Sequence, residues 1–128
     1  MSSYDCIFCN IEEERIVDQN NACLVIRDLY PVTELHTLII SQNHVESIFE
    51  LSEDEMKGFF QMLKKQKDIL VSKDPTIKAF NIGINDGVQA GQTIPHLHIH
   101  LIPRRDGDVD DPRGGVRGVI PSKQNYEK

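Results

Sequence analysis

Three histidines occupy alternate positions in the segment 94–102, at His96, His98 and His100. A β-strand points successive side chains to opposite faces, so we expect the three imidazoles on one face and the intervening aliphatic residues on the other. Three imidazoles on one face would repel one another when protonated, and a purely structural role offers no reason to accept that repulsion. The pattern therefore predicts a functional face rather than an ordinary half-exposed strand.

Imidazoles in such a row can act as metal ligands or as nucleophiles and acid-base groups. In an extended strand the outer two histidines lie about 13 Å apart at their backbones, so the three rings do not easily reach a single ion. We expect the histidines to divide between different tasks. Directly before them, the loop 87–93 contains two glycines, and such a loop can turn successive backbone N–H groups toward an anion. We interpret it as a phosphate-binding loop.

The chain has three cysteines, Cys6, Cys9 and Cys23. An odd number without an export signal argues against a disulfide framework. The Cys6-x-x-Cys9 spacing favours metal or redox chemistry, and no strand-helix-strand pattern of a thioredoxin-like redox protein surrounds it. The alternative is that Cys6 and Cys9 are small buried residues or an incidental pair, with His44 an ordinary surface residue before the helix. Cys23 lies inside an apolar run and is expected in the core.

The length and charge of the chain narrow its role. Its 128 residues fit one domain with a single hydrophobic core. The formal net charge of -6 argues against binding to nucleic acid, because that affinity depends largely on neutralising phosphates. The N-terminus has neither a basic region nor an apolar stretch long enough for a signal peptide or a membrane span. We therefore expect a cytoplasmic protein with no nucleic-acid or membrane partner.

One long helix and several strands are expected to position these residues. The segment 52–55, Ser-Glu-Asp-Glu, is a capping box, and the helix behind it ends before Asp74-Pro75. Its packed face is predicted to carry Met56, Phe59, Phe60, Leu63 and Leu70. Runs rich in Leu, Val and Ile between turn residues predict strands over 22–28 and 36–41, and apolar alternation predicts one over 79–86, in addition to the histidine strand. Because strands and helix do not alternate, we expect an α+β domain with a mostly antiparallel sheet, followed beyond Pro103 by an extended arm.

The stretch from Asn85 to Arg104 resembles the signature of the histidine triad (HIT) nucleotide hydrolases and transferases. The resemblance consists of Gly91-Gln92-Thr93 followed by His96-x-His98-x-His100-x-x-Pro103-Arg104. It extends to Cys6-Ile7-Phe8-Cys9, to Asp28 followed by Pro31, to His36-Thr37-Leu38 and to His44-Val45-Glu46. It implies one HIT-like domain over 1–128, with a core over about 1–103 and an arm over 104–128. The implied fold is a five-stranded, mostly antiparallel sheet with one long helix and a short N-terminal helix, extended across a homodimer.

The resemblance implies a role for each matching residue. His98 would attack phosphorus, with His36 and His100 beside it as supporting and hydrogen-bonding groups. The residues around the phosphate and leaving group would be Asn85, Gly91, Gln92 and Thr93. Asp28 would bind the ribose hydroxyls, although taken alone it could be an ordinary turn aspartate before Pro31. The base cleft would be lined by Phe8, Ile11 and Ile26, which as single apolar residues would be assigned to the core.

Relatives that carry the N-terminal cysteine pair form a zinc-bearing branch, which this chain resembles. The four ligands would be Cys6, Cys9, His44 and His96. Such a Cys₂His₂ set is tetrahedral and leaves no open position, so the zinc would be structural. His96 would then have no part in the chemistry of His98. No obligatory magnesium is expected.

The implied activity is hydrolysis at the α-phosphate of purine nucleoside phosphoramidates or dinucleoside polyphosphates, through a covalent nucleotidyl-histidine. A nucleotidyl transferase shares that intermediate, but the transferase branch has Gln where this chain has His100. A nucleotide-binding module with little turnover is the third hypothesis. The chain departs from the family pattern at Leu35, where Gly usually precedes the histidine, and it contains no tryptophan. In the arm, the residues that would bring positive charge to a partner's cleft are Arg113, Arg117 or Lys123.

Overall fold

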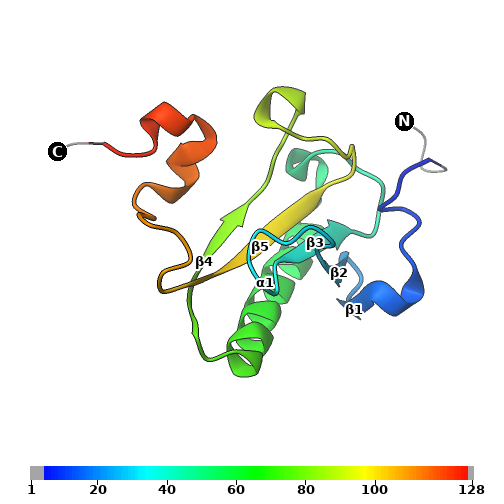
Figure 1. Cartoon of the computed structure of the whole chain (residues 1–128). Coiled ribbons are helices and arrows are strands. Elements are labelled where there is room, and N and C mark those ends of the chain that lie inside the picture. Colours follow the sequence, from blue (N-terminus) through cyan, green and yellow to red (C-terminus); the bar gives the residue numbers. More distant parts are fainter. Residues whose placement is uncertain (1–4, 127–128) are drawn as a thin grey trace.

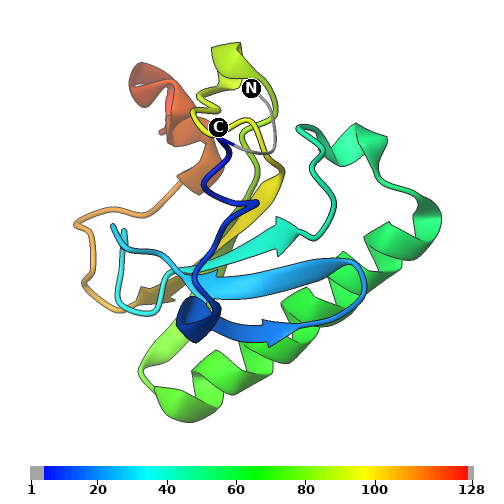
Figure 2. The same cartoon turned by 90° about the vertical axis from the view of Figure 1, so that its right-hand side faces the viewer.

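A computed structural model describes residues 5–126, so the first four and last two residues of the expected domain lie outside the described part. Five strands form one antiparallel sheet in the order β1-β2-β3-β5-β4, and one long helix, α1, lies against one face (Figure 1, Figure 2). The elements are β1 (Ile16–Gln19), β2 (Cys23–Arg27), β3 (Thr37–Ser41), α1 (Glu53–Lys73), β4 (Ile77–Gly83) and β5 (His98–Arg105). The predicted α+β fold is confirmed.

Helix α1 begins at the predicted capping box. The Ser52 hydroxyl accepts a hydrogen bond from the Glu55 N–H at 3.1 Å, and the Glu55 carboxylate accepts one from the Ser52 N–H at 2.9 Å. The buried face of the helix consists of Phe59, Met62, Gln66 and Leu70. The prediction that Met56 and Phe60 pack inside is wrong: they are 44% and 63% exposed, because they lie on the flank of the face that contacts the sheet.

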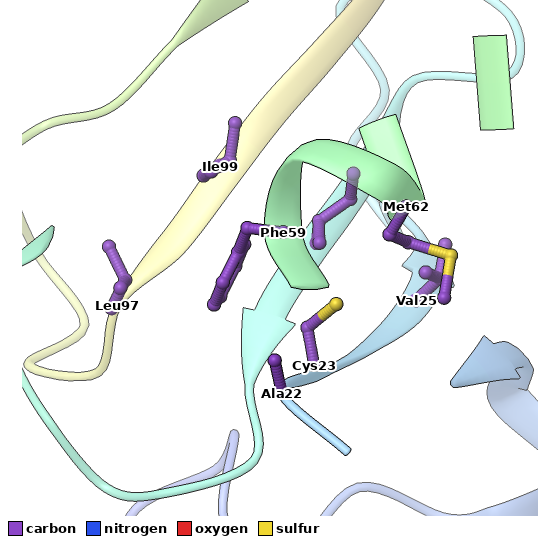
Figure 3. Close-up of a cluster of buried hydrophobic side chains, with 8 residues drawn as sticks. Ala22, Cys23, Val25, Phe59, Met62, Leu97 and Ile99 are labelled. Atoms are coloured by element: carbon purple, nitrogen blue, oxygen red, sulfur yellow. The ribbon is translucent and has the colours of Figure 1, made fainter. Parts of the chain in front are cut away.

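The sheet separates two hydrophobic clusters. On one face, aliphatic side chains of β2, β3 and β5 pack against Phe59 and Met62 of α1 (Figure 3). The opposite face carries the alternate side chains of the same strands. There the N-terminal segment covers part of the sheet, and Cys6 and Phe8 pack over aliphatic residues of β2 and β3. The helix and the N-terminal segment thus cover different faces, and both His98 and Phe8 belong to the face that α1 leaves open.

The three histidines do not form one uninterrupted strand. Strand β5 begins at His98, and His96 precedes it. The N–H of His96 donates to the carbonyl of Ile94 at 2.8 Å, which closes a tight turn around Pro95. His96 is therefore held apart from His98 and His100, whose side chains share one face of β5.

Strand β5 continues to Arg105, two residues beyond Pro103, where the sequence pattern ends. Proline has no N–H for a sheet ladder, so it is tolerated only where one side of a strand is unpaired. Strand β3 pairs with β5 only as far as Leu101, and β4 alone pairs with the rest of it. Pro103 therefore sits in the singly paired part of the strand.

Strand β4 ends at Gly83, before the predicted end at Asp86. The chain leaves the sheet there because Asp86 binds a different partner. Its carboxylate accepts hydrogen bonds from the Ser47 hydroxyl at 2.9 Å and from the Ile48 N–H at 3.1 Å. These contacts direct the following loop toward the entrance of β5.

The remaining helical elements are short 3-10 turns: η1 (Glu13–Arg15), η2 (Ile48–Glu50), η3 (Val88–Ala90), η4 (Gly115–Val119) and η5 (Pro121–Lys123). The expected short N-terminal helix is the single turn η1. The C-terminal segment differs from the expected extended arm, because Gly114 and Gly115 adopt positive φ and start a series of turns beside β4 (Figure 1). Among the described residues, no helix is long and apolar enough to cross a membrane.

Candidate active site and metal site

A cavity of about 360 Å³ opens on the sheet face opposite α1. Its floor is formed by side chains of β2, β3 and β5, and its rim by the N-terminal segment and the loop before β5. Nine of the predicted site residues line it: Phe8, Ile26, Asp28, His36, Asn85, Gly91, Thr93, His98 and His100. The fold therefore brings these distant segments of the chain to one cleft.

The ring of His98 is held in one tautomer. Its Nδ1 lies 2.8 Å from the carbonyl oxygen of His96. A carbonyl oxygen can only accept, so Nδ1 carries the proton and donates it to this hydrogen bond. In the neutral ring Nε2 then holds the lone pair. The Phe8 ring packs edge-on against His98, with centroids 5.0 Å apart, and limits the positions that the imidazole can adopt.

His36 and His100 form a directed hydrogen-bond chain. The N–H of Val32 donates to Nδ1 of His36 at 3.0 Å, so this nitrogen is an acceptor and the proton of the neutral ring is on Nε2. Nε2 of His36 lies 2.9 Å from Nδ1 of His100 and donates to it. His100 must then carry its own proton on Nε2. The chain therefore ends in an N–H donor on His100, which lines the cleft.

Both rings of this chain are neutral near pH 7. Burial first, and then the nearby His98 and His36, lower the pKa of His100 to about 4. Burial also lowers the pKa of His36, and the Asp28 carboxylate opposes that effect. The neutral state is the one that the Val32–His36–His100 chain requires, because a doubly protonated ring would have no acceptor nitrogen.

The two carboxylate oxygens of Asp28 have different neighbours. Oδ1 accepts a hydrogen bond from the Tyr30 N–H at 2.8 Å, which is the ordinary contact of a turn aspartate. Oδ2 lies 3.6 Å from Nε2 of His36. Asp28 also lines the cleft. The turn role is thus present, and it occupies only one of the two oxygens.

The loop before β5 is stabilised internally. Gln92 does not line the cleft: its side-chain oxygen accepts from the Gly87 N–H at 2.8 Å, and its amide nitrogen donates to two backbone carbonyls. The N–H of Gly91 donates to the Val88 carbonyl at 2.9 Å, so this amide is not free to hold an anion as the sequence predicts. Gly87 and Gly91 have φ of 104° and 99°, which explains why glycine stands at both positions.

Leu35 adopts the backbone conformation that glycine would supply. Its φ is 72°, in the left-handed region that a leucine disfavours. Its side chain packs against the cluster between α1, β4 and β5. The next residue still lines the cleft, and the His36 N–H donates to the Thr33 carbonyl at 3.1 Å. The replacement therefore leaves the position of His36 intact.

A larger cavity of about 580 Å³ lies between the cleft and the C-terminal segment. The two cavities share Val32, His36, Asn85 and His100. The outer walls of the larger cavity come from β4 and from the turns around η4, and they are mainly apolar. His36 and His100 therefore lie between two cavities, the cleft beside the N-terminal segment and the larger cavity beside the C-terminal segment.

The four predicted metal ligands lie together beside the cleft. The ligand atoms of Cys6, Cys9, His44 and His96 are all within 4.8 Å of one another. The Cys9 Sγ lies 3.0 Å from Nδ1 of His44, and the Cys6 Sγ lies 3.3 Å from Nδ1 of His96. A tetrahedral zinc ion with ordinary bond lengths would hold sulfur and nitrogen ligands about 3.6 Å apart. These four residues therefore fit a metal ion.

The surroundings of the cluster also suit a cation. Nε2 of His96 donates to the Ser41 carbonyl at 2.8 Å, which leaves Nδ1 as the ligand atom. Burial and the neighbouring Cys6 raise the pKa of the Cys9 thiol to about 11. Two thiolates at this place thus need a compensating positive charge, which a bound metal supplies.

Several lining residues have no role in the sequence prediction: Ile7, Arg15, Leu29, Tyr30, Val32, Leu38 and Ile94. Leu38 could have been found, because strand alternation places it on the same face as His36. Arg15 could not, because it reaches the cleft through η1 and an irregular pairing of β1 with β2. Ile11, predicted for the base cleft, lines a neighbouring cavity instead.

The fold and the site together define an α+β domain with a histidine-lined cleft. The model of the HIT domain matches residues 10–107, which is more than half of the chain. The protein belongs to the histidine triad (HIT) family.

Relatives and solved structures agree with this placement. An uncharacterized HIT-like protein of Saccharolobus solfataricus is 34% identical, covering 95% of this chain and 90% of the relative. The asymmetrical bis(5'-nucleosyl)-tetraphosphatase of Schizosaccharomyces pombe is 38% identical, covering 66% of this chain and 46% of that enzyme. The crystal structure of a zinc-bound histidine triad protein from Mycobacterium smegmatis has a TM-score of 0.74 at 30% identity, covering 84% of this chain and 80% of that one.

Proposed function

We propose that the protein is a nucleotide hydrolase that cleaves at the α-phosphate of purine nucleoside phosphoramidates or dinucleoside polyphosphates. The observation that carries the proposal is the hydrogen bond from Nδ1 of His98 to the His96 carbonyl. It leaves Nε2 as the nitrogen that holds the lone pair and can act as the nucleophile, in a cleft that His36 and His100 also line. The similarity to the Schizosaccharomyces pombe tetraphosphatase supports a substrate of this class.

The reaction proceeds in two displacements at phosphorus. In the first, the lone pair on Nε2 of His98 forms a bond to the α-phosphorus, and the bond to the leaving group breaks. A polyphosphate leaves as an anion, and an amine takes its proton from solvent. In the second, water attacks the same phosphorus, the electrons of the nitrogen–phosphorus bond return to Nε2, and the proton of the water passes to solvent. The product is a nucleoside monophosphate.

The neighbouring groups stabilise the charges that develop. When Nε2 of His98 is bound to phosphorus, the ring becomes cationic, and the His96 carbonyl at Nδ1 offsets that charge. The N–H on Nε2 of His100 donates to a phosphate oxygen or to the leaving atom. Because Val32 and His36 fix the direction of that donor, it needs no reorganisation during the reaction.

We assign the remaining parts of the substrate to the two cavities. The nucleoside lies in the cleft beneath the N-terminal segment, with Phe8 and Ile26 against the base and Asp28 as the acceptor for the ribose hydroxyls. Asn85, Gly91 and Thr93 lie around the phosphate. The leaving group extends past His100 into the larger cavity. Gln92 acts indirectly, by holding the loop.

The metal in this proposal is zinc. Two thiols and two imidazoles are the ligands of a closed structural zinc site, and the similarity to the zinc-bound protein from Mycobacterium smegmatis supports this choice. Cys6, Cys9, His44 and His96 would hold the ion, which would supply folding free energy and leave no coordination position for a substrate. All three cysteines are free, which supports a reducing compartment such as the cytoplasm.

The proposal includes a homodimer. Strand β4 is an edge of the sheet. Three apolar residues of α1 and β4, Met56, Phe60 and Ile82, are each more than 40% exposed. A strand edge and an apolar helix flank are liabilities in a monomer, and an isologous contact would cover both.

Trapping of the covalent intermediate tests the proposed activity. Zinc-loaded protein is incubated with adenosine phosphoramidate or with diadenosine tetraphosphate carrying a labelled α-phosphate, quenched in acid-free denaturant and analysed by mass spectrometry. We expect turnover of at least one substrate and a nucleotidyl adduct on His98. His98→Ala should lose the adduct and all measurable turnover, with unchanged circular dichroism and zinc content. Near-normal kcat in this variant would show that another group is the nucleophile.

A further inference from the structure

The cleft has an end far from the catalytic histidines, and the sheet register defines it. One row of paired positions crosses the sheet from β5 to β1: His100 lies opposite Leu38, Leu38 opposite Ile26, and Ile26 opposite Ile16. Three strand spacings separate the ends of this row, a distance of about 14 Å. A nucleoside whose α-phosphate is at β5 therefore extends its base toward β1.

Arg15 stands at that far end. It is the last residue of η1 and directly precedes β1. It lines the cleft, and it also lines a neighbouring cavity of about 360 Å³ beneath the N-terminal segment. Ile7 is shared in the same way, so the two cavities meet at Ile7 and Arg15. The neighbouring cavity also contains Glu12, the residue that precedes η1.

The hydrogen-bond donors of Arg15 and the acceptors of Glu12 match some purine bases better than others. Arg15 is half-buried, and its guanidinium has no ion pair or side-chain hydrogen bond within residues 5–126. A guanidinium only donates, and it pairs in a bidentate manner with the O6 and N7 acceptors of guanine. Adenine presents an amino group in place of O6, and that group is itself a donor. The carboxylate of Glu12 supplies the acceptor that the N1–H and amino group of guanine require.

We propose that Arg15, at the end of the cleft, and Glu12, in the adjoining cavity, recognise the base and select a 6-oxopurine nucleotide, guanine above all, over adenine. This inference rests on the proposed function, since it takes His98 as the site of the α-phosphate. Arg15 reads the O6 and N7 atoms. Glu12, which is exposed, contributes the weaker contact to N1 and the amino group.

Binding of three nucleoside monophosphates tests the inference. Isothermal titration calorimetry on the full-length, zinc-loaded protein measures Kd for GMP, IMP and AMP. We expect GMP and IMP to bind at least about 5-fold more tightly than AMP, because one good bidentate contact discriminates by about 1–3 kcal/mol. Arg15→Ala should weaken GMP and IMP by that factor and change AMP less than about 2-fold. Glu12→Gln should weaken GMP more than IMP, because IMP lacks the amino group.

A matched control comes from the same turn. Glu14→Gln changes an exposed carboxylate of η1 that lines neither cavity, and it should leave all three affinities unchanged. Equal affinity of the wild type for GMP and AMP, or a preference for AMP, would overturn the base selection while leaving the proposed hydrolase intact. An equal loss of GMP and AMP affinity in Arg15→Ala would make Arg15 a general contact and would also overturn it. If none of the three nucleotides binds the wild type, both the selection and the proposed function fail.

Discussion

At the scale of single residues, the site uses three histidines in three different ways. His98 is oriented by a backbone carbonyl, His100 by another imidazole, and His96 by a carbonyl on the side away from the metal ligands. Each partner fixes which nitrogen carries the proton. The identical side chains, each two residues from the next, therefore present a lone pair, an N–H donor and a candidate metal ligand.

The protonation of His100 gives a prediction about pH. Its pKa is lowered to about 4, so the folded protein does not take up this proton between pH 6.5 and about 4, whereas the unfolded chain does. The contribution of His100 to stability is present above pH 6.5 and is lost as the pH falls through this window. We expect the His100 ring signals in an NMR titration to stay unchanged down to about pH 5. A midpoint near 6.5 would contradict the buried hydrogen-bond chain.

At the scale of elements, the turn before β3 carries conformational strain. Leu35 holds φ of 72° so that His36 can enter the cleft, and a left-handed leucine costs about 1–2 kcal/mol. The packing of its side chain offsets part of this strain. The turn thus combines an unfavourable backbone conformation with a favourable side-chain contact. Two substitutions at Leu35 can measure these two contributions separately.

Leu35→Ala removes the packing and keeps the strain, whereas Leu35→Gly removes both. We expect the glycine variant to be more stable than the alanine variant by about 1 kcal/mol, measured by urea unfolding. Leu63, a half-buried leucine of α1, is the matched control. There the order should reverse, since glycine is worse than alanine in a helix. The same order at both positions would show that the backbone of Leu35 is not strained.

The elements also show what can be predicted from sequence. The start of α1 was predictable because a capping box is a local interaction between Ser52 and Glu55. The face of α1 was only partly predictable, since Met56 and Phe60 are as apolar as the buried residues and only the position of the sheet distinguishes them. The continuation of β5 past Pro103 depends on where its neighbour β3 ends. Such features follow from tertiary pairing and leave no local signal.

Some residues of the candidate site could likewise be predicted from the sequence and others could not. The row of histidines and the cysteine pair indicate chemistry by residue type and spacing, whereas His44 and His96 joined the candidate metal ligands only through the family resemblance. The structure brings these four residues together. The roles of Gln92 and Arg15 were not predictable. A glutamine beside a phosphate loop can face the ligand or the loop. Arg15 reaches the cleft through η1, which ends directly before β1, and through the irregular pairing of β1 with β2.

At the scale of the whole molecule, the four candidate metal ligands join the N-terminal segment to more distant parts of the chain. His44 and His96 lie 35 and 87 residues after Cys9 in the sequence, and the fold brings them to the two cysteines. Cys6→Ser should lose stoichiometric zinc, measured by elemental analysis of protein purified without chelator, and should lower the melting temperature. Cys23→Ala is the control: it removes a buried thiol outside the cluster and should retain the zinc. Zinc-free wild-type protein would contradict the proposed metal site.

The C-terminal segment gives the second prediction at this scale. Truncation after Asp111 removes η5 and also η4, whose Gly115, Val116 and Val119 line the larger cavity. We expect a higher KM for diadenosine tetraphosphate and little change for adenosine phosphoramidate, whose leaving group is too small to reach that wall. Light scattering should give a dimer mass for both proteins, because the proposed contact uses β4 and α1. A full-length monomer would contradict the dimer, and unchanged KM for both substrates would contradict the role of the segment.

The order of pairing in the sheet has a consequence for how the protein folds. Strands β1, β2 and β3 pair with their neighbours in sequence, and so do β4 and β5. Only the pairing of β3 with β5 joins these two units, and it must close the chain between Ser41 and His98, which costs more loop entropy than any other pairing in the sheet. His36 belongs to the first unit, and His98 and His100 belong to the second. The cleft therefore exists only after this slowest closure, and in refolding we expect nucleotide binding to return later than helical circular dichroism.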